Sequence, residues 1–393
     1  MIPVDEARRL ATEGLSSLPA ETVSLADALG RAVAADVTAT RALPGFHNSA
    51  MDGYAVRHAD LGAGALVVAM EIPAGVVPAR ALGPGEAARI FTGAPLPDGA
   101  DTVIMQEDAR RDGDQVRFTE RPPKCDNVRY RGEDIDLGEA VVQRGRALTA
   151  GDLAMLAAQG HCTVAVVRRP RVAIVPNGDE LVPIDAQVGP GQVPNTNAHM
   201  LAAQVRAAGG EPWAFDPVAD TLDAVTEALR EAAEGADLVL TTGGMSVGDF
   251  DHARDALRAD GQLAFYKVRL KPGKPLGLGR LGGTPILGLP GNPVSAFVGF
   301  ELFGRPMLRT LGGFHLVDHP RFEGRLARAI GRNRTRPEFV RCDVLADGRL
   351  LPWTKQGSGM ISSLLHADAL ALIPEGPGSL EEDATVLAVD LRR

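Results

Sequence analysis

The chain has 393 residues, 45% of them hydrophobic and 23% charged, and a formal net charge of −9. Because domains usually contain about 100–200 residues, this length predicts two to three folded domains, and the composition excludes a disordered or fibrous protein. No block of Lys and Arg is long enough to follow a phosphate backbone, so we expect a small-molecule ligand and no nucleic acid. The 45 glycines and 28 prolines predict many turns.

Cysteine use and hydropathy predict a cytoplasmic protein. Cys125, Cys162 and Cys342 lie far apart and form no CxxC pair, which argues against a disulfide framework and a cysteine zinc site. Residues 1–15 carry acids and arginines where a signal peptide needs an apolar core, and no segment reaches the roughly 18 apolar residues of a membrane span. We therefore expect a reducing compartment and no membrane partner.

The first part of the chain predicts two short helices and then a β domain. Pro3 suits the first turn of a helix, and Ser24 with Asp27 forms a capping pair for a second one. From residue 38 to residue 139, short apolar runs such as 102–105 are separated by turns rich in Gly and Pro. This pattern is typical of a β domain with many turns.

A helix and a strand follow the β domain. Thr149 and Asp152 form a capping pair for a helix that ends near Gln159, and the apolar run 164–167 predicts a strand. We expect these elements to rejoin the N-terminal helices, which makes the β domain an insertion. The expected domains are therefore a helical linker domain, residues 1–37 and 140–168, and an inserted β domain, residues 38–139.

From residue 169 to residue 313, short apolar strands alternate with amphipathic helices, which predicts a doubly wound, largely parallel α/β domain. Ligands of such sheets bind beyond the carboxyl ends of the strands, so we expect the functional loops there. Residues 314–393 return to short strands and predict a small C-terminal β barrel. The expected strands of the α/β domain are 171–175, 213–215, 238–241, 263–268 and 286–289, and its expected helices are 198–208, 222–234, 251–260 and 294–310.

The first of three glycine-rich loops after these strands is TTGGMSVGDFD, residues 241–251. Its paired glycines can present backbone N–H groups to an anion, and Asp249 and Asp251 suit a hard cation. A second interpretation is the nucleophile elbow of a hydrolase, because residues 244–248 satisfy G-x-S-x-G between a strand and a helix. The additional residues before Gly244 lengthen what should be a sharp turn, so we favour the anion loop.

The second loop is KPGKP, residues 271–275, and the third is GLPGNPVS, residues 288–295. Two prolines stiffen the second loop, and we expect Lys271 and Lys274 to be solvated until an anion binds. In the third loop Asn292 suits the cap of the following helix. Each loop alone could be a tight turn, but three at one sheet edge favour a phosphate and metal site.

Two further patterns have simpler explanations. GLGRLG at 277–282 satisfies G-x-G-x-x-G, but a strand pattern follows it instead of the helix that a dinucleotide site requires, so we expect a hairpin turn. His315 and His319 are spaced as metal ligands on a helix, but glycines and a proline surround them. We expect a surface loop there.

Seven segments of the chain together resemble the molybdopterin molybdenumtransferase family, the MoeA-type enzymes of molybdenum cofactor synthesis, which are related to the C-terminal domain of gephyrin. They occur in the family's order and span most of the chain. Two departures are Asn177, where the family often has threonine, and the Asp249-Phe250 pair. The segments are PGFHNSAMDGYAV (44–56), RIFTGAPLPDGADTVIMQED (89–108), VRYRGEDI (128–135), NGDEL (177–181), TTGGMSVGDFD (241–251), KVRLKPGKP (267–275) and ILGLPGNPVSA (286–296).

The resemblance implies a four-domain chain whose α/β domain is of the molybdopterin-binding type. It implies a homodimer and the insertion of molybdate into adenylylated molybdopterin, with Mg²⁺-dependent release of AMP. Possible further partners are a molybdopterin adenylyltransferase and the apo-molybdoenzymes, or their chaperones, that receive the cofactor. Local lysines and backbone N–H groups suit these anionic substrates in a protein of net negative charge.

The resemblance and the loop chemistry together imply the site residues. Lys271 and Lys274 are expected to hold phosphate or molybdate, and Asp52 to reach the site from the neighbouring subunit. The expected metal ligands are Glu180 and Asp251. The expected catalytic residues are Asp52, Thr92, Asp134, Glu180, Asp220, Asp251, Lys271 and Lys274. The expected cofactor-binding residues are Gly243, Gly244, Ser246, Gly248, Lys267, Pro290, Gly291, Asn292, Pro293 and Ser295.

Two alternative functions share parts of this pattern. A molybdopterin adenylyltransferase has a similar α/β domain and similar loops, but it lacks the SAMDGYA and GEDI segments that this chain carries at 49–55 and 132–135. A non-enzymatic scaffold of the same fold, with a role like receptor clustering by gephyrin, would use the dimer and lose the acids. The acids are present here, which favours an enzyme.

Overall fold

The structure is a computed structural model that describes residues 1–243 and 252–392. The chain divides into two compact units, each described here by itself. Unit 1 consists of Met1–Ala35, Arg144–Leu153 and Thr163–Arg393, and unit 2 consists of Asp36–Gln143 and Ala154–Cys162. Unit 2 is therefore an insertion in the sequence of unit 1. The finer division into four domains stays a prediction.

The two flanks of this insertion pair with each other in unit 1. Strand β1 (Ala20–Ser24) is antiparallel to β12 (Thr163–Val167) along its whole length. The capping pair at Thr149 is confirmed at the start of α2 (Ala150–Ala158), because its N–H donates to Asp152 Oδ2 over 2.8 Å. Ser24 also acts as a cap, but the segment that follows is a single 3₁₀ turn, η1 (Leu25–Asp27).

A six-stranded sheet forms the centre of the α/β part of unit 1, in the order β16-β13-β17-β20-β19-β18. The first four strands are parallel and the last two are antiparallel to their neighbours, which confirms a largely parallel, doubly wound sheet. The strands are β13 (Arg171–Pro176), β16 (Glu211–Ala214), β17 (Leu238–Thr242), β18 (Gln262–Tyr266), β19 (Gly277–Leu281) and β20 (Thr284–Leu289).

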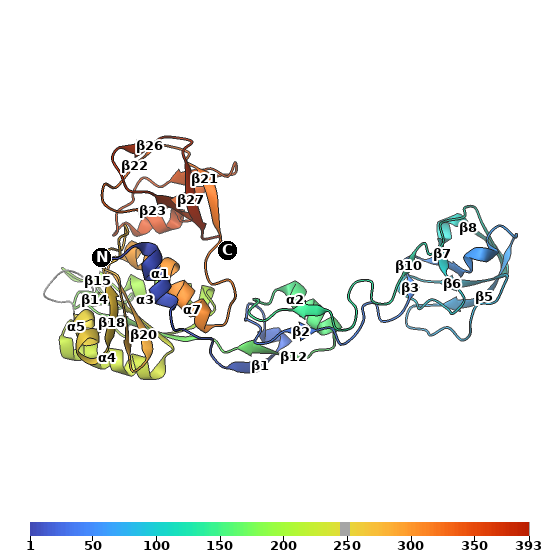
Figure 1. Cartoon of the computed structure of the whole chain (residues 1–393), viewed down its shortest axis with the longest axis horizontal. Coiled ribbons are helices and arrows are strands. Elements are labelled where there is room, and N and C mark those ends of the chain that lie inside the picture. Colours follow the sequence, from blue (N-terminus) through green and yellow to red (C-terminus); the bar gives the residue numbers. More distant parts are fainter. Residues whose placement is uncertain (244–251, 393) are drawn as a thin grey trace. The chain divides into compact units, whose positions relative to one another are not determined.

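Helices cover both faces of this sheet, and alternating residues of each strand enter two separate cores. Val172 and Ile174 of β13 pack in one core, whereas Ala173 and Val175 pack in the other. Figure 1 shows α4 and α5 on one face and α1, α3 and α7 on the other. Burial on both faces explains why β13 is a continuous apolar run. The helices are α1 (Val4–Thr12), α3 (Thr196–Ala207), α4 (Leu222–Gly235), α5 (His252–Asp260), α6 (Pro293–Gly299) and α7 (Arg305–Leu311).

The expectation of a hairpin turn at residues 277–282 is wrong. Residues 277–281 form strand β19, and the turn consists of Gly282 and Gly283. Both turn glycines have positive φ, +57° and +92°. Gly279 allows a close approach within the sheet, because a Cβ there would lie 2.8 Å from the carbonyl oxygen of Gln262. A glycine that permits close packing inside a strand therefore cannot be distinguished by sequence from a glycine in a turn.

Two other expectations in this part of the chain need correction. The helix expected at 294–310 is interrupted by a π-helical turn, η4 (Phe300–Gly304), between α6 and α7. His319 lies in a loop but is buried, and its Nε2 is 2.6 Å from the carboxylate of Glu301. Among the described residues, no group of three His, Cys, Asp or Glu side chains could hold a metal ion.

The C-terminal strands form a small barrel. Five strands pair in the order β21-β27-β25-β23-β24, and a bridge between Leu326 and Leu350 joins the two edges. Phe339, Leu370 and Val389 extend the barrel into the same core as α1 and α3. The strands are β21 (Arg321–Arg325), β22 (Ile330–Gly331), β23 (Glu338–Val344), β24 (Leu350–Pro352), β25 (Ala369–Ile373), β26 (Ser379–Leu380) and β27 (Thr385–Asp390), with the 3₁₀ segment η5 (Ile361–His366).

Unit 2 is built on a second six-stranded sheet, in the order β7-β4-β6-β5-β9-β8. Its central strand β4 follows the turn that contains Asp52 and is buried at all four positions. Two short antiparallel pairs, β2–β11 and β3–β10, form separate two-stranded sheets. The strands are β2 (Val37–Thr38), β3 (Asn48–Ser49), β4 (Gly53–Val56), β5 (Leu66–Ile72), β6 (Glu86–Ile90), β7 (Thr102–Met105), β8 (Ala109–Asp112), β9 (Gln115–Phe118), β10 (Val128–Arg129) and β11 (Ala140–Val142).

Among the described residues, every helix is too short or too polar to cross a membrane.

Candidate active site

The second and third glycine-rich loops line one cavity of unit 1, with a volume of about 460 Å³. Residues of the C-terminal barrel complete its wall, so the cavity lies where the α/β sheet edge meets the barrel. The lining residues are Lys271, Pro272, Gly273, Lys274, Pro275, Pro290, Asn292 and Ser295 from the two loops, and Arg336, Gln356, Gly357 and Ser358 from the C-terminal region. Five predicted site residues and three of their neighbours in the KPGKP loop therefore share one cavity with four residues that sequence reasoning missed.

Backbone hydrogen bonds fix the second loop at both ends. The Lys271 N–H donates to the carbonyl of Pro337 over 3.0 Å, and the Phe339 N–H donates to the carbonyl of Lys271 over 2.8 Å. At the other end, the Val268 N–H donates to the carbonyl of Lys274 over 3.0 Å. The loop is therefore positioned before any ligand arrives, which limits the entropy that binding costs.

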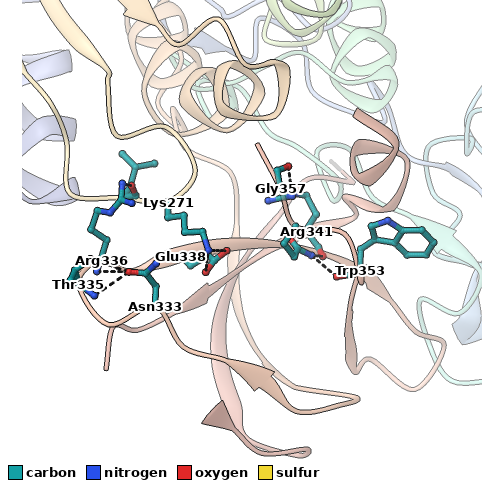
Figure 2. A network of polar contacts seen from close by, with 10 residues as sticks. Lys271, Asn333, Thr335, Arg336, Glu338, Arg341, Trp353 and Gly357 are labelled. Atoms are coloured by element: carbon teal, nitrogen blue, oxygen red, sulfur yellow. Dashed lines mark hydrogen bonds and ion pairs between the residues drawn. The ribbon is translucent and has the colours of Figure 1, made fainter. Parts of the chain in front are cut away.

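Lys271 is paired with an acid, so the expectation that both lysines are solvated is wrong for this one. Its Nζ lies 3.1 Å from the carboxylate of Glu338, whose side chain is only 7% exposed (Figure 2). A buried carboxylate requires a charged or hydrogen-bonding partner, and Glu338 is far from the loop in sequence. The ion pair holds Lys271 at the cavity wall and compensates its charge.

Lys274 differs from Lys271 in its surroundings. It is exposed, and no described residue forms an ion pair or a side-chain hydrogen bond with its ammonium group. Its charge is therefore available to an anion in the cavity. The two lysines of one short loop thus have different electrostatic environments.

The third loop presents its side chains to the cavity because its backbone groups are satisfied elsewhere. Asn292 occupies the N-cap position of α6, but its side chain makes no capping bond, contrary to expectation. One reason is that the Val294 N–H donates instead to the carbonyl of Ser358 over 3.2 Å. The Asn197 side chain fixes the turn through a 2.8 Å bond to the Gly291 carbonyl. Ser295 is buried and lines the cavity.

Gly243 connects the first loop to the other two. It has φ +89°, and a Cβ there would lie 2.3 Å from the carbonyl oxygen of Asn177, so no larger residue fits. A Cβ on Gly291 would lie 3.7 Å from the Cα of Gly243. The NGDEL segment, the start of the first loop and the third loop therefore meet at this point.

Two predicted acids lie beside this junction. Asn177 forms a parallel bridge with Val218, and the Asp220 N–H donates to Asp179 Oδ1 over 3.0 Å. Glu180 follows Asp179 directly and is exposed. Asp220 Oδ1 is buried and has no hydrogen-bond partner. An unpartnered carboxylate oxygen in an acidic loop suits a hard divalent cation, which prefers oxygen ligands.

Four predicted residues of the first loop lie outside the described residues. They are Gly244, Ser246, Gly248 and Asp251. The anion-loop and nucleophile-elbow interpretations of residues 244–248 both fall on this segment and stay predictions.

Lys267 is not part of the cavity lining. Its ammonium group lies 4.8 Å from the ring centroid of the neighbouring Tyr266. Its backbone has φ +71°, which is rare for a residue with a side chain, and its carbonyl accepts the Ile2 N–H over 3.1 Å. The structure thus separates Lys267 from Lys271 and Lys274.

Asp52 and Thr92 form a compact pair in unit 2. Asp52 Oδ1 accepts hydrogen bonds from the Thr92 N–H over 2.8 Å and from the Thr92 hydroxyl over 2.7 Å. The backbone hydrogen bond from Thr92, followed by the bond from its hydroxyl, lowers the pKa of Asp52 below its ordinary value. The two hydrogen bonds therefore favour the charged form of this exposed carboxylate and fix its orientation.

Asp134 lies in a different turn of unit 2. Its N–H donates to the carbonyl of Leu43 over 3.0 Å, and its side chain is exposed. In the described part of the chain it makes no side-chain hydrogen bond with Asp52 or Thr92. Asp52 and Thr92 therefore contact each other directly, and the catalytic roles expected for these residues and for Asp134 stay predictions.

Comparison with known proteins assigns the chain to a family. Residues 2–160 match the MoeA N-terminal region (domain I and II), residues 173–310 a probable molybdopterin binding domain, and residues 323–391 the MoeA C-terminal region (domain IV). A molybdopterin molybdenumtransferase of Nostoc sp. is 38% identical over 387 residues, covering 94% of this chain and 88% of the relative. The chain belongs to the MoeA family.

Other MoeA relatives agree over the whole length. The molybdopterin molybdenumtransferase of Bacillus subtilis (strain 168) is 35% identical over 410 residues, covering 100% of this chain and 94% of the relative. The crystal structure of the molybdopterin biosynthesis MoeA protein of Pyrococcus horikoshii OT3 superposes with a TM-score of 0.87 at 30% identity. It covers 99% of this chain and 100% of that one. The sequence-based family resemblance is confirmed.

The part of the cavity wall that sequence reasoning missed comes from the C-terminal barrel. Arg341 is fully buried and holds this wall: its Nη2 donates to the carbonyl of Gly357, and the Gln356 side chain bonds its backbone N–H and carbonyl (Figure 2). Burial lowers the pKa of Arg341 to about 10. The glycine-rich KQGSGM segment at 355–360 was the sequence signal that could have indicated this wall. It follows no strand of the parallel sheet, so the rule that selected the other loops did not select it.

Proposed function

We propose that this chain is a molybdopterin molybdenumtransferase, which transfers molybdenum to molybdopterin in the synthesis of the molybdenum cofactor. The full-length similarity to enzymes of that name gives the class of reaction. The observation that carries the proposal is the cavity between the KPGKP and PGNP loops, whose lining, among the residues that the structure describes, includes two lysines and an arginine but no acid. Molybdate is a tetrahedral dianion, and such a lining attracts it.

The substrate is adenylylated molybdopterin, and AMP is the leaving group. Lys274 and Ser295, which both line the cavity, bind the oxyanion. Lys271 contributes N–H donors that Glu338 holds in place. Molybdenum is ligated by the sulfurs of the pterin, so the reaction requires no cysteine from the protein.

Mg²⁺ is the proposed metal cofactor, and Glu180 and Asp251 are the residues that would hold it. Asp220 is a further candidate, because its N–H donates to Asp179 in the loop that carries Glu180. The unpartnered Asp220 Oδ1 supports a cation at this acidic loop. When bound, Mg²⁺ would neutralise phosphate charge on the leaving AMP. The hydrogen bond from the Asp220 N–H to Asp179 Oδ1 holds the Asp220 segment next to the loop that carries Glu180.

A homodimer is proposed on the family resemblance, with Asp52 of the partner subunit reaching the site. Asp52 supports this role because Thr92 fixes its carboxylate while leaving it exposed. A mixture of Asp52→Ala and Lys274→Ala subunits should then recover part of the activity that each variant lacks. Two inactive variants that stay inactive together would place both residues in one subunit's site.

The proposed function is tested by incubating the purified chain with adenylylated molybdopterin, molybdate and Mg²⁺ and measuring AMP. We expect AMP release that requires both molybdate and Mg²⁺. Formation of adenylylated molybdopterin from ATP would identify an adenylyltransferase instead. The absence of both activities would identify a non-enzymatic scaffold.

A further inference from the structure

Arg89 of unit 2 lies beside the turn that contains Asp52 and holds the backbone of that turn. It belongs to strand β6 and is directly opposite Tyr54 of β4. Its Nη1 donates to the carbonyl of Gly53 over 2.8 Å and to that of Ile90 over 3.3 Å. Because Gly53 follows Asp52 directly, the guanidinium fixes the backbone next to the acid.

The second terminal nitrogen of Arg89 acts on the other backbone contact of Asp52. Its Nη2 donates to Gln106 Oε1 over 2.7 Å. The Gln106 N–H in turn donates to the carbonyl of Asp52 over 3.0 Å. One guanidinium therefore connects the residue that follows Asp52 with the residue that binds the Asp52 carbonyl. It does so through the planar fork of an arginine, which a lysine ammonium lacks.

Two aromatic rings hold the Arg89 side chain in place. Its Cζ lies 4.6 Å from the ring centroid of Phe91 and 5.3 Å from that of Tyr54. A cation within about 6 Å of a ring centroid is attracted by the π electrons of that ring. Phe91 directly precedes Thr92, which binds the Asp52 carboxylate. The same side chain therefore contacts both segments that form the Asp52–Thr92 pair.

The positive charge of Arg89 also acts on Asp52. The described hydrogen bonds of its guanidinium go to two backbone carbonyls and one side-chain amide oxygen, all of them uncharged. The pKa of Asp52 is lowered first by the bonds from the Thr92 N–H and hydroxyl and, to a smaller extent, by the charge of Arg89. Arg89 thus fixes the Asp52 turn and favours the charged form of its carboxylate.

We propose that Arg89 is a positioning residue of the proposed reaction and holds the Asp52 turn so that its carboxylate keeps the orientation that catalysis requires. The inference rests on the proposed function, because Arg89 acts through Asp52, an expected catalytic residue. The guanidinium contacts backbone, amide and rings, and its role requires no contact with a substrate. Loss of Arg89 therefore lowers turnover and leaves the KM for molybdate unchanged.

The test measures molybdate-dependent AMP release by variants of the full chain. Arg89→Met removes the charge and the three hydrogen bonds, and it should lower kcat up to about a hundredfold, because a misplacement of about 1 Å can cost that much. Arg89→Lys keeps the charge but loses the fork, so it should lower kcat less. The matched control is Arg80→Met, which removes two hydrogen bonds to Glu86 at the other end of β6 and should leave kcat unchanged.

Two further measurements separate positioning from a general structural role. In an Asp52→Ala background, Arg89→Met should lower the remaining activity no further, because the two residues act as a unit. Effects that multiply would show that Arg89 acts independently of Asp52 and would overturn the inference. NMR titration should show a higher Asp52 pKa in Arg89→Met and a nearly unchanged one in Arg89→Lys, which keeps the charge. An unchanged Asp52 pKa in Arg89→Met would also overturn it.

Different outcomes separate this inference from the proposed function. Wild-type kcat in Arg89→Met, together with a large loss in Asp52→Ala, would overturn the inference and leave the proposed function standing. A wild-type chain without molybdate-dependent AMP release would contradict the proposed function itself. If Arg89→Met does not fold, Arg89→Lys decides: kcat equal to that of the wild type at normal thermal stability overturns the inference, and a lower kcat at unchanged KM supports it.

Discussion

The cavity of unit 1 and the Asp52 turn of unit 2 arrange charge in opposite ways. In the cavity, cations surround a space, and Glu338, a buried acid beside it, is already paired with Lys271. In the Asp52 turn, an exposed carboxylate is held by two hydrogen bonds from Thr92. The first region is built to receive an anion, and the second presents a fixed negative charge.

This comparison shows that both regions are organised before a ligand binds, but by different means. The cavity depends on contacts between segments that are distant in sequence, such as the bond from the Lys271 N–H to Pro337. The Asp52 turn depends on two loops at the end of one sheet. Substitutions should therefore damage the cavity through its tertiary contacts and the Asp52 turn through single hydrogen bonds.

The largest effect is expected from Gly243→Val. Gly243 has a positive φ, and a Cβ there would lie 2.3 Å from a backbone oxygen. A valine at this position therefore forces the junction of the glycine-rich loops to move. A misplacement of about 1 Å can lower turnover about a hundredfold, so AMP release should fall at least that far. The matched control is Gly282→Val, because that glycine also has positive φ, +57°, but nothing lies within 4 Å of its Cβ position. Equal activity in the two variants would refute the role of the junction.

Lys274→Ala should reduce molybdate-dependent AMP release about ten- to a hundredfold, because it removes one charge-assisted hydrogen bond to the oxyanion. The free energy of unfolding should change by about 0.5 kcal/mol or less, since the side chain is exposed and unpaired. Kinetics against molybdate concentration and a urea unfolding curve measure the two effects. A large loss of stability with unchanged kinetics would give Lys274 a structural role.

Lys271→Ala should instead destabilise the fold. It leaves Glu338 buried without its cation, which costs about 1–3 kcal/mol of unfolding free energy. The double variant Lys271→Ala/Glu338→Gln removes the unpaired charge and should recover part of this loss. Urea unfolding of the single and double variants checks both values. A Lys271→Ala protein as stable as the wild type would show that the ion pair does not support the loop.

The smallest effect concerns the Asp52 turn. Thr92→Val keeps the backbone N–H and removes the hydroxyl, so the pKa of Asp52 should rise toward its ordinary value while staying lowered. Because the folded-state pKa is below the unfolded one, the stability that Asp52 contributes is present above the unfolded pKa of about 4 and is lost as the pH falls through the folded value. NMR titration of the Asp52 carboxyl measures the shift. The control is Thr119→Val. The Thr119 hydroxyl donates to the Asp108 carbonyl, so its removal should leave the pKa of Asp52 unchanged.

Local patterns predicted most of the fold. The run 102–105 is a strand with the expected bounds, and the strands expected at 171–175 and 238–241 end within one residue of the predicted positions. Burial on the sheet favours such alternating or continuous apolar residues. The pattern failed at 277–282, where glycines serve close packing inside β19 and not a turn. Glycine permits both conformations, so only the neighbouring strand distinguishes them.

Sequence reasoning found the site residues in loops that follow strands of the α/β sheet. It missed the site residues that other parts of the chain contribute. The KPGKP and PGNP loops were found by this rule, and they share a cavity. Glu338 and Arg336 lie in the C-terminal region, more than 60 residues beyond the KPGKP loop, and their positions depend on tertiary packing. The Asn292 side chain was expected to be a cap, but a distant carbonyl, that of Ser358, accepts the α6 N–H of Val294.

Anomalous diffraction from crystals of the full chain soaked in molybdate tests the central claim most directly. The molybdenum position can be found without knowledge of the pterin substrate. We predict a peak in the cavity between the KPGKP and PGNP loops, within hydrogen-bonding reach of Lys274, that disappears in crystals of Lys274→Ala. A peak elsewhere in the molecule, or one that Lys274→Ala leaves unchanged, would contradict the assignment of this cavity as the oxyanion site.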